Sequence, residues 1–257
     1  MTVVIPVLLY HSVSDDPLSN GSWGAIARRD FAAHVDAILA SGRQALTMTT
    51  LAAALRGERP LPEHAVAVTF DDGYDDTYPA VELLCAHDLA PTVYVTTGEI
   101  GARHRLTTRQ VASLAHMPGV EIASHGVHHR RLDELNDAEV LDELRPSKWC
   151  LEDLIGDYID SFAYPHGAYD RRVQNALIAC DYRSGAAVKN ALCHDSDDPF
   201  AIARVTVTAA TSWQQITEVL EGRGLPLAWR AERLRTRAYR RVRRQRRRIL
   251  AVGTVRC

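Results

Sequence analysis

Short apolar runs alternate with longer amphipathic stretches along this chain, and this alternation limits the possible folds more than any other feature of the sequence. The apolar runs have the length of β-strands and cover residues 3–10, 65–70, 91–97, 120–125, 160–165, 182–188 and 202–207. The stretches with helical spacing cover residues 30–41, 76–87, 107–116, 136–155, 170–180 and 212–222. Repeated strand–helix alternation favours a parallel sheet covered by helices. Thr107, and Asn136 followed by Glu139, are typical N-terminal helix caps.

Polar residues stand where several of these strands end. They are His11, Asp71-Asp72, His125 and Pro165-His166. Active sites of parallel α/β folds form at the carboxyl ends of strands. These groups follow different strands and must meet at one point. A ring of strands brings them together more readily than an open sheet, in which the strands lie in a row. We therefore predict a closed or nearly closed (β/α) barrel, rather than a doubly wound sheet, over residues 1–222 as a single domain, followed by a basic helical tail over residues 223–257.

The charge is unevenly distributed. With 257 residues, 46% of them apolar, the chain can form one large core. Residues 229–248 contain eleven arginines and one glutamate, a local charge of +10, so the remainder carries −12 of the overall −2. An acidic body with a basic tail is not typical of a nucleic-acid binder, and we expect no nucleic-acid partner.

The basic tail has two main interpretations. Apolar residues recur in it near helical spacing: Trp229, Leu234, Ala238 and Val242. Such a helix could lie on an anionic membrane surface, or the tail could be solvated, and RNA binding is a weaker third alternative. The membrane hypothesis predicts that truncation after Pro226 abolishes co-sedimentation with anionic vesicles.

The cysteines and the N-terminus bear on the compartment. The chain has an odd number of cysteines, five, and no C-x-x-C pair, which argues against a disulfide framework and suits a reducing compartment. The N-terminus is interpreted as a first strand rather than a signal peptide, and no apolar run approaches the roughly 18 residues that span a bilayer. We expect a cytoplasmic protein, peripheral at the inner membrane face if the tail binds there.

Two neighbouring carboxylates and a histidine-rich turn are the strongest chemical signals. Asp71-Asp72-Gly73 is also good turn chemistry, but two carboxylates after a buried strand repel each other unless a positive charge lies nearby. His125 and His129 have the four-residue separation of many zinc sites, although histidine-rich turns are often only solvated loops. Two imidazoles and one carboxylate would leave metal positions open for water and substrate, as in catalytic sites. Asp71 is then available as a base.

Three segments together resemble the polysaccharide deacetylases with a NodB homology domain (carbohydrate esterase family 4). In order and spacing, the motifs are Thr69-Phe70-Asp71-Asp72-Gly73, Ser124-His125-Gly126-Val127-His128-His129 and Phe162-Ala163-Tyr164-Pro165-His166-Gly167. The opening Pro6 to Val13 also resembles the first strand of many members, and the resemblance covers roughly residues 3–210.

The resemblance implies a distorted (β/α)7-type barrel and the roles of these residues. Asp72, His125 and His129 match the divalent-metal ligands of the family, with Zn²⁺ expected, and Asp71 matches its general base. The implied reaction is hydrolysis of an N-acetyl or O-acetyl group on a glycan, in which the metal polarises the acetyl carbonyl and Asp71 takes a proton from water. The backbone N–H of His166 is expected to help hold the oxyanion.

The sequence departs from the family pattern in its charge partner and its acid. Where the third motif often begins with arginine, this chain has Ile159, Asp160 and Ser161, and we predict that Arg204 holds Asp71 ionised instead. No histidine follows Arg204 to act as the late general acid. The candidate acids are His11, His166 and His128, with His11 slightly preferred over a packing role. His104, His116 and His194 are interpreted as solvated.

Two other functions stay open at this point. One is a barrel metallohydrolase that acts on amides or phosphoesters. A two-metal phosphoesterase would need more metal ligands around the site than this chain clearly offers. The other is a non-catalytic glycan-binding relative that has lost its acid, and a protein that releases no acetate from any N-acetylated oligosaccharide would favour it.

Overall fold

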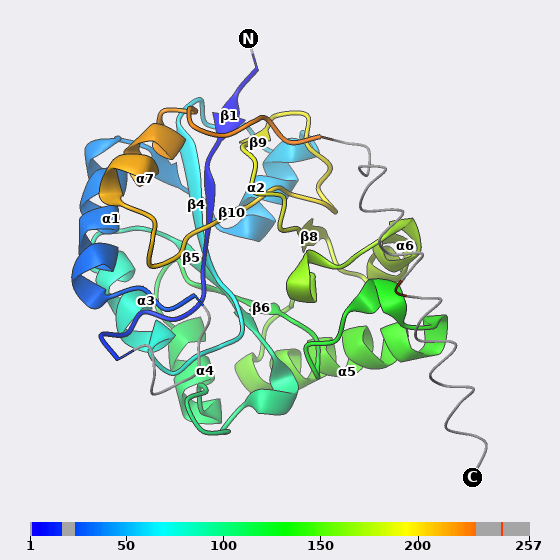
Figure 1. Cartoon of the computed structure of the whole chain (residues 1–257). Helices are drawn as coiled ribbons and strands as arrows, with labels where there is room; N and C mark the ends of the chain where they lie inside the picture. Colours follow the sequence, from blue (N-terminus) through cyan, green and yellow to red (C-terminus); the bar gives the residue numbers. More distant parts are fainter. Residues whose placement is uncertain (1, 17–23, 230–242, 244–257) are drawn as a thin grey trace.

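A parallel barrel organises the computed structural model, which describes residues 2–16, 24–229 and 243 (Figure 1). Its strands are hydrogen-bonded in the order β10 (Val205–Thr206), β2 (Val7–Tyr10), β4 (Ala65–Phe70), β5 (Pro91–Val95), β6 (Glu121–Ser124), β7 (Ser161–Ala163) and β8 (Ser184–Ala186). All neighbours along this path are parallel. The predicted strands are therefore confirmed in their order and approximate positions.

One irregular segment closes the ring. The N–H of Ala187 donates to Ile202 O at 2.8 Å, and the N–H of Ile202 donates to Gly185 O at 2.9 Å. A few residues later, Val205 pairs with Leu8 of β2. Residues 202–206 thus bond to β8 at one end and to β2 at the other, which gives the predicted distorted (β/α)7 barrel.

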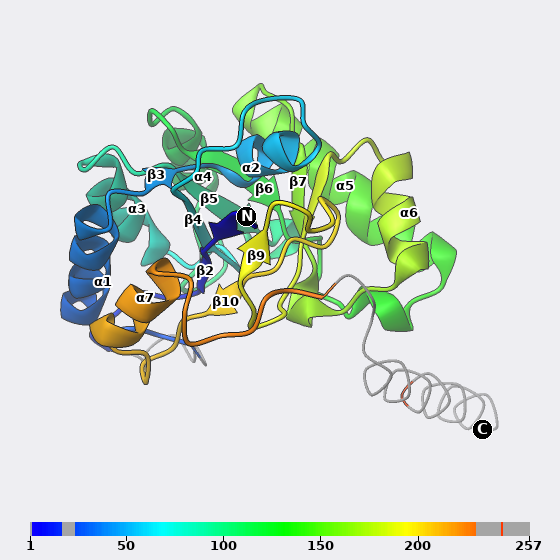
Figure 2. The ribbon, with the colours of Figure 1, turned by 90° about the horizontal axis from the view of Figure 1, so that it is seen from above.

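Helices surround the strands on the outside (Figure 2). The predicted amphipathic stretches form α1 (Arg28–Ala40), α3 (Thr77–Cys85), α4 (Thr108–Ala115), α5 (Asp137–Ile155), α6 (Arg171–Ala179) and α7 (Trp213–Leu220). Both predicted N-terminal caps are present as capping boxes, Thr107 with Gln110 and Asn136 with Glu139. Each box satisfies N–H groups that a helix start leaves free.

Several short elements were not predicted. Pro6 divides the first strand into β1 (Val4–Ile5) and β2, and β1 pairs antiparallel with β9 (Cys193–His194). The additional strand β3 (Gln44–Ala45) pairs with β4, and α2 (Met48–Leu55) lies across the N-terminal end of the barrel (Figure 2). The 3₁₀ turns are η1 (Thr97–Glu99), η2 (Leu132–Glu134) and η3 (Pro165–Gly167).

The barrel interior is lined by small side chains. Along β4, Val66, Val68 and Phe70 belong to the apolar cluster that includes the helices, whereas Ala65 and Ala67 belong to the inner cluster. The other inner residues include Ala123, Ala163, Ala186, Ala203 and Tyr94. Because side chains alternate along a strand, Thr69 and Asp71 continue the inward row of Ala65 and Ala67. The small interior leaves room for larger polar groups at the end where β4 stops.

The packed body continues past the predicted boundary at residue 222. Leu227 forms a parallel bridge with Leu192, and the N–H of Ala228 donates to Leu192 O at 2.8 Å. Ala228 O also contacts Nε2 of His194 at 3.1 Å, and His194 is buried, so its interpretation as a solvated residue is wrong. The predicted helical tail lies outside the described residues apart from its first residues and Arg243. Among the described residues, no helix is long and apolar enough to cross a membrane.

Candidate active site

Asp71 and Arg204 form a buried ion pair at the C-terminal end of the barrel. The guanidinium donates to both carboxylate oxygens, from Nη1 to Oδ1 at 2.6 Å and from Nη2 to Oδ2 at 2.8 Å. Its remaining donors reach Thr69 Oγ1 at 3.2 Å and Ala187 O at 3.3 Å. Arg204 is fully buried and Asp71 is 2% exposed. The contact between these residues that the sequence suggested is therefore present.

The pair fixes the charge state of both groups. Burial raises the pKa of the Asp71 carboxyl, but the Arg204 guanidinium outweighs burial, and the pKa is lowered. Burial lowers the pKa of Arg204, and Asp71 reverses this and raises it. Asp71 is thus an ionised carboxylate with lone pairs left over, since each carboxylate oxygen can accept two hydrogen bonds.

Asp72, His125 and His129 converge beside this pair. Asp72 Oδ1 lies 3.4 Å from Nε2 of His125 and 3.2 Å from Nε2 of His129. One ligand atom from each of the three residues lies within 4.8 Å of the other two, and among the described residues this is the one such group that could hold a metal ion. The three candidate ligands therefore share one point in space.

The histidine tautomer suits metal binding. Nδ1 of the buried His125 donates to the backbone carbonyl of Ala163 at 2.8 Å. This bond places a proton on Nδ1 and leaves Nε2, which faces Asp72, as the ring nitrogen that can bind a metal. Metal-ligating histidines usually have their second ring nitrogen bound in this way.

One oxygen of the Asp72 carboxylate lacks a hydrogen-bond partner, and this indicates whether a metal ion fits the site. Asp72 Oδ1 is buried and accepts no hydrogen bond, although two imidazole nitrogens lie close to it. Burial raises the pKa of Asp72, but His125 and His129 outweigh burial and lower it, so the group is a carboxylate. A buried, charged oxygen without a donor is costly unless a cation satisfies it. A divalent ion fits this set of two nitrogens and one oxygen.

The site residues adopt unusual backbone conformations. Asp72, His129 and His166 have φ angles of 72°, 53° and 58°. Non-glycine residues rarely enter this left-handed region, and those that do cluster at functional sites because the surrounding structure holds them there. Here the three left-handed residues aim side chains from three different strand ends at one place.

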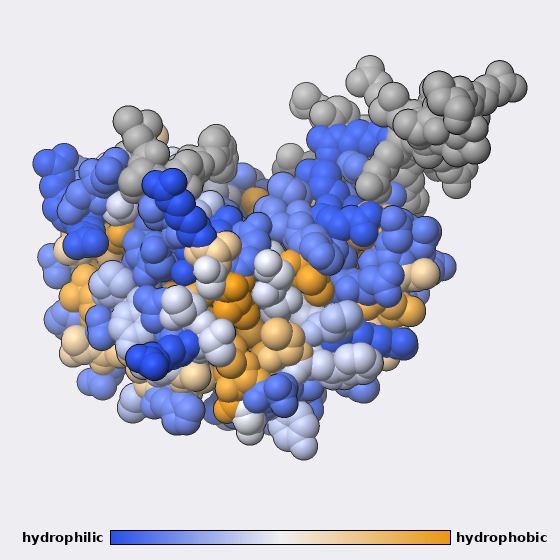
Figure 3. All heavy atoms as spheres, turned by 90° about the horizontal axis from the view of Figure 1, so that it is seen from below, coloured by the Kyte–Doolittle hydropathy of each residue, from blue (hydrophilic) through white to orange (hydrophobic). Residues whose placement is uncertain are grey.

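A cavity of about 580 Å³ opens onto these groups. His11, Asp71, His125, His129 and His166 line it. The other lining residues are Leu9, Val188, Asn190, Val205, Thr206, Thr208 and Leu225. Figure 3 views the end of the barrel where the strands stop, and a band of apolar side chains crosses the middle of this face among hydrophilic ones. The sequence offered no signal for Val188, Asn190 or Leu225, which belong to no motif.

His11 faces the cavity with a free ring nitrogen. Its Nδ1 is buried and has no hydrogen-bond partner. Burial lowers the pKa of His11, although Asp71 and Asp72 act to raise it. The turn after His11 is fixed by Asp76, which accepts from Ser12 Oγ at 2.5 Å and from the N–H of Val13 at 3.2 Å. The imidazole is therefore held close to both aspartates.

The other two candidate acids differ in position. The ring of His166 lies against His129, with centroids 4.4 Å apart, and burial together with His129 lowers its pKa to about 4. His128 contacts Glu143 through Nδ1 at 3.1 Å, and its side chain is 68% exposed. His128 does not line the cavity, and it is too far into solvent to serve as the acid there.

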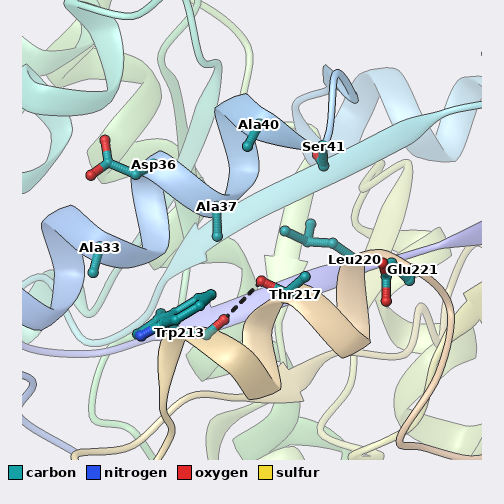
Figure 4. A pocket seen from close by; sticks show the side chains of 9 residues that line it. All are labelled: Ala33, Asp36, Ala37, Ala40, Ser41, Trp213, Thr217, Leu220 and Glu221. Carbon is teal, nitrogen blue, oxygen red and sulfur yellow. Dashed lines mark hydrogen bonds between the residues drawn. The ribbon is translucent and has the colours of Figure 1, made fainter.

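A second groove lies between α1 and α7 (Figure 4). Its floor is formed by Ala33, Ala37 and Ala40, and the half-exposed Trp213 flanks it. Asp36 and Glu221 are its titratable residues. The residues that line this groove contain no cluster of metal-ligating groups.

Comparison with known proteins places this site in a family. The family profile described as "Polysaccharide deacetylase" matches residues 58–185, which include Asp71, Asp72, His125, His129 and His166. The chain belongs to the polysaccharide deacetylase family. Members of this family are metal-dependent hydrolases. The matched region excludes His11 and Arg204, so their assignment depends on the geometry described above.

Individual family members agree with this assignment. YxkH of Bacillus subtilis, whose name assigns it to the polysaccharide deacetylases, is 27% identical over 209 residues, 81% of this chain and 73% of that protein. The poly-beta-1,6-N-acetyl-D-glucosamine N-deacetylase of Escherichia coli is 31% identical over 101 residues, 33% of this chain but 15% of that larger protein. The similarity to YxkH thus covers most of both proteins.

Solved structures share the fold. The deacetylase PplD of Streptococcus pyogenes, solved with acetate, aligns with a TM-score of 0.77 at 22% identity over 86% of this chain and 99% of that one. IcaB of Ammonifex degensii aligns with a TM-score of 0.73 at 22% identity over 85% of this chain and 97% of that one. The family barrel is therefore present nearly in full.

Replacing Arg204 in this family member tests the buried pair. Arg204→Met leaves the Asp71 carboxylate buried and unpaired, so we expect a loss of about 3–5 kcal/mol in the free energy of unfolding, measured by urea denaturation. The double variant Asp71→Asn/Arg204→Met removes both charges and should recover part of this loss. If the two single losses simply add in the double variant, the pair is not energetically coupled.

Proposed function

We propose that this protein removes acetyl groups from a glycan by metal-assisted hydrolysis, with the N-acetyl amide as its main substrate. The observation that carries this proposal is the arrangement of two neighbouring carboxylates. Asp72 shares one point with His125 and His129, while Asp71 is kept ionised next to it by Arg204. One carboxylate is thus suited to bind a cation and the other to accept a proton.

Asp72, His125 and His129 would hold the metal, and two nitrogens with one oxygen suit Zn²⁺. When bound, the metal supplies Lewis acidity toward the acetyl carbonyl and the attacking water. The three protein ligands come from β4 and from the turn after β6, so the barrel itself fixes their separation. The strained backbone at Asp72 and His129 supports this assignment.

Asp71 is the general base. The buried guanidinium of Arg204 lowers the pKa of Asp71, which keeps the carboxylate ionised and correctly oriented. Its Oδ2 lies 3.8 Å from Nε2 of His125, on the side of the metal ligands. Asp71 therefore accepts a proton from water as the oxygen of that water attacks the acetyl carbon.

His11 is the general acid. When the carbon–nitrogen bond breaks, the departing amine needs a proton, and the free, buried Nδ1 of His11 lies in the same cavity. His166 is less suited to act as the acid, because its ring packs against the proposed metal ligand His129, with centroids 4.4 Å apart. The left-handed turn at His166 instead favours the use of its backbone N–H toward the oxyanion.

The alternatives fit less well. A two-metal phosphoesterase needs a second cluster of ligands, and the described residues contain one group of three. A purely glycan-binding protein would have no use for a buried aspartate–arginine pair at the cavity floor, which is costly to bury.

Replacing Asp71 tests the function. With Zn²⁺ added, the parent protein should release acetate from oligosaccharides of N-acetylglucosamine, and a chelator should stop the release. Asp71→Asn keeps the metal ligands, so bound zinc should be retained while acetate release falls about 10²- to 10⁴-fold. Acetate release at the parent rate in Asp71→Asn would contradict the assigned base, and no release by the parent on any acetylated oligosaccharide would favour the binding alternative.

Replacing His11 separates an acid from a packing residue. An amide leaving group needs a proton, whereas 4-nitrophenyl acetate releases a stable anion. His11→Ala should therefore lower kcat/KM about 10²-fold or more for the N-acetyl substrate and much less for the ester. The exposed His116→Ala serves as a control. Equal losses on both substrates would assign His11 to packing.

Truncation tests the proposed membrane contact of the basic tail. Because Leu227 and Ala228 pair with Leu192, a cut after Pro226 would damage the body, and the cut belongs after Trp229. The full chain should co-sediment with vesicles that contain anionic lipid at low salt, and the truncated chain should not. Equal sedimentation of both would eliminate the tail as a membrane contact.

A further inference from the structure

The turn that carries His129 is clamped on two sides. On one side, the carbonyl oxygens of Gly126 and Val127 accept hydrogen bonds from the N–H groups of Thr97 and Gly98 in η1, at 3.0 and 2.9 Å. On the other side, the N–H groups of Val127 and His128 both donate to Oε2 of Glu143, each at 2.9 Å. The backbone of the turn is thus held between η1 and α5.

Glu143 reaches this turn from the buried face of α5. It is 1% exposed, and its second oxygen contacts Nδ1 of His128 at 3.1 Å. Burying a carboxylate is costly unless it is hydrogen-bonded, and bonds from N–H groups to an ionised oxygen are among the stronger ones. The Glu143 carboxylate makes three contacts with this one turn, so its position matches the polar groups of the turn.

Gly126 makes this approach possible. It has a φ of 79°, and a Cβ atom at this position would lie 3.0 Å from Oε2 of Glu143. A side chain at residue 126 would therefore push against the carboxylate. The glycine between His125 and Val127 is explained by the close approach of Glu143.

The same helix anchors the strand end that precedes the turn. Ser124 Oγ donates to Ser147 Oγ of α5 at 2.8 Å, and the N–H of Gly126 donates to Ser124 Oγ at 3.2 Å. Ser147 is one helical turn after Glu143. Helix α5 therefore holds the segment from Ser124 to His128 at both ends, through Ser147 at its start and Glu143 at its end.

We propose that Glu143 is a positioning residue that orients His129 for metal binding, an inference that rests on the proposed function. His129 directly follows the two peptide groups that Glu143 binds, and its left-handed backbone, with φ of 53°, depends on their orientation. With Glu143 in place, Nε2 of His129 lies 3.2 Å from Asp72 Oδ1. Without Glu143, metal binding would have to supply the free energy that orders the turn, and the affinity for the metal would fall.

Zinc affinity tests this inference without reference to acetate release. The dissociation constant for Zn²⁺ is measured by competition with a chromophoric chelator, on proteins shown by circular dichroism to be folded at the assay temperature. Glu143→Ala removes the acceptor and Glu143→Asp withdraws it, so both should raise the dissociation constant about 10- to 100-fold. Glu143→Gln should recover most of the affinity, because its carbonyl oxygen can accept both backbone N–H groups.

The matched control is Asp142→Ala, which removes an exposed acidic residue from the same helix and should bind zinc like the parent. Equal affinity of the parent and Glu143→Asp would overturn the inference, as would an equal loss in Asp142→Ala. Failure of the parent itself to bind zinc would overturn the proposed metal site and this inference together. Glu143→Asp and Glu143→Gln keep the test decisive if Glu143→Ala does not fold.

Discussion

A carboxylate and a guanidinium share the buried interior at the C-terminal end of the barrel, and much of the architecture follows from this pair. Either charge alone would be very costly there, but together they neutralise each other, and Asp71, Thr69 and Ala187 give each guanidinium nitrogen of Arg204 an acceptor. The pair also needs space. The alanines on the inner faces of the neighbouring strands provide it, so larger aliphatic residues in that row would exclude the guanidinium.

The ion pair is also part of the closure of the barrel. Arg204 lies in the segment that bonds to β8 at Ile202 and to β2 at Val205. The arginine that usually opens the third motif is replaced here by Ile159, Asp160 and Ser161, on the approach to β7. The required feature is a positive charge next to Asp71, and a barrel can supply it from more than one strand because all its strands end around the same point.

The sequence predicted what depends on local pattern and missed what depends on long-range packing. Strand and helix periodicity located the ring, and motif residues at strand ends located the convergence of Asp71, Asp72 and the histidines. Helix α2 was missed because its side chains Met48, Leu51 and Ala52 pack into the inner cluster and leave no clear polar face. The burial of His194 and the packing of Ala228 depend on a contact between distant segments, which no local pattern reports.

The adjacency of the two aspartates poses a geometric problem, and the backbone solves it. Successive side chains of a strand point to opposite faces, so an inward Asp71 would place Asp72 on the helix side of the sheet. Strand β4 instead ends at Phe70, Asp71 still donates its N–H to Tyr10 O at 3.0 Å, and Asp72 and Gly73 both adopt left-handed φ angles, 72° and 67°. This turn returns the second carboxylate to the side of His125 and His129. The two neighbouring carboxylates reach one site because the chain leaves the strand conformation at this point.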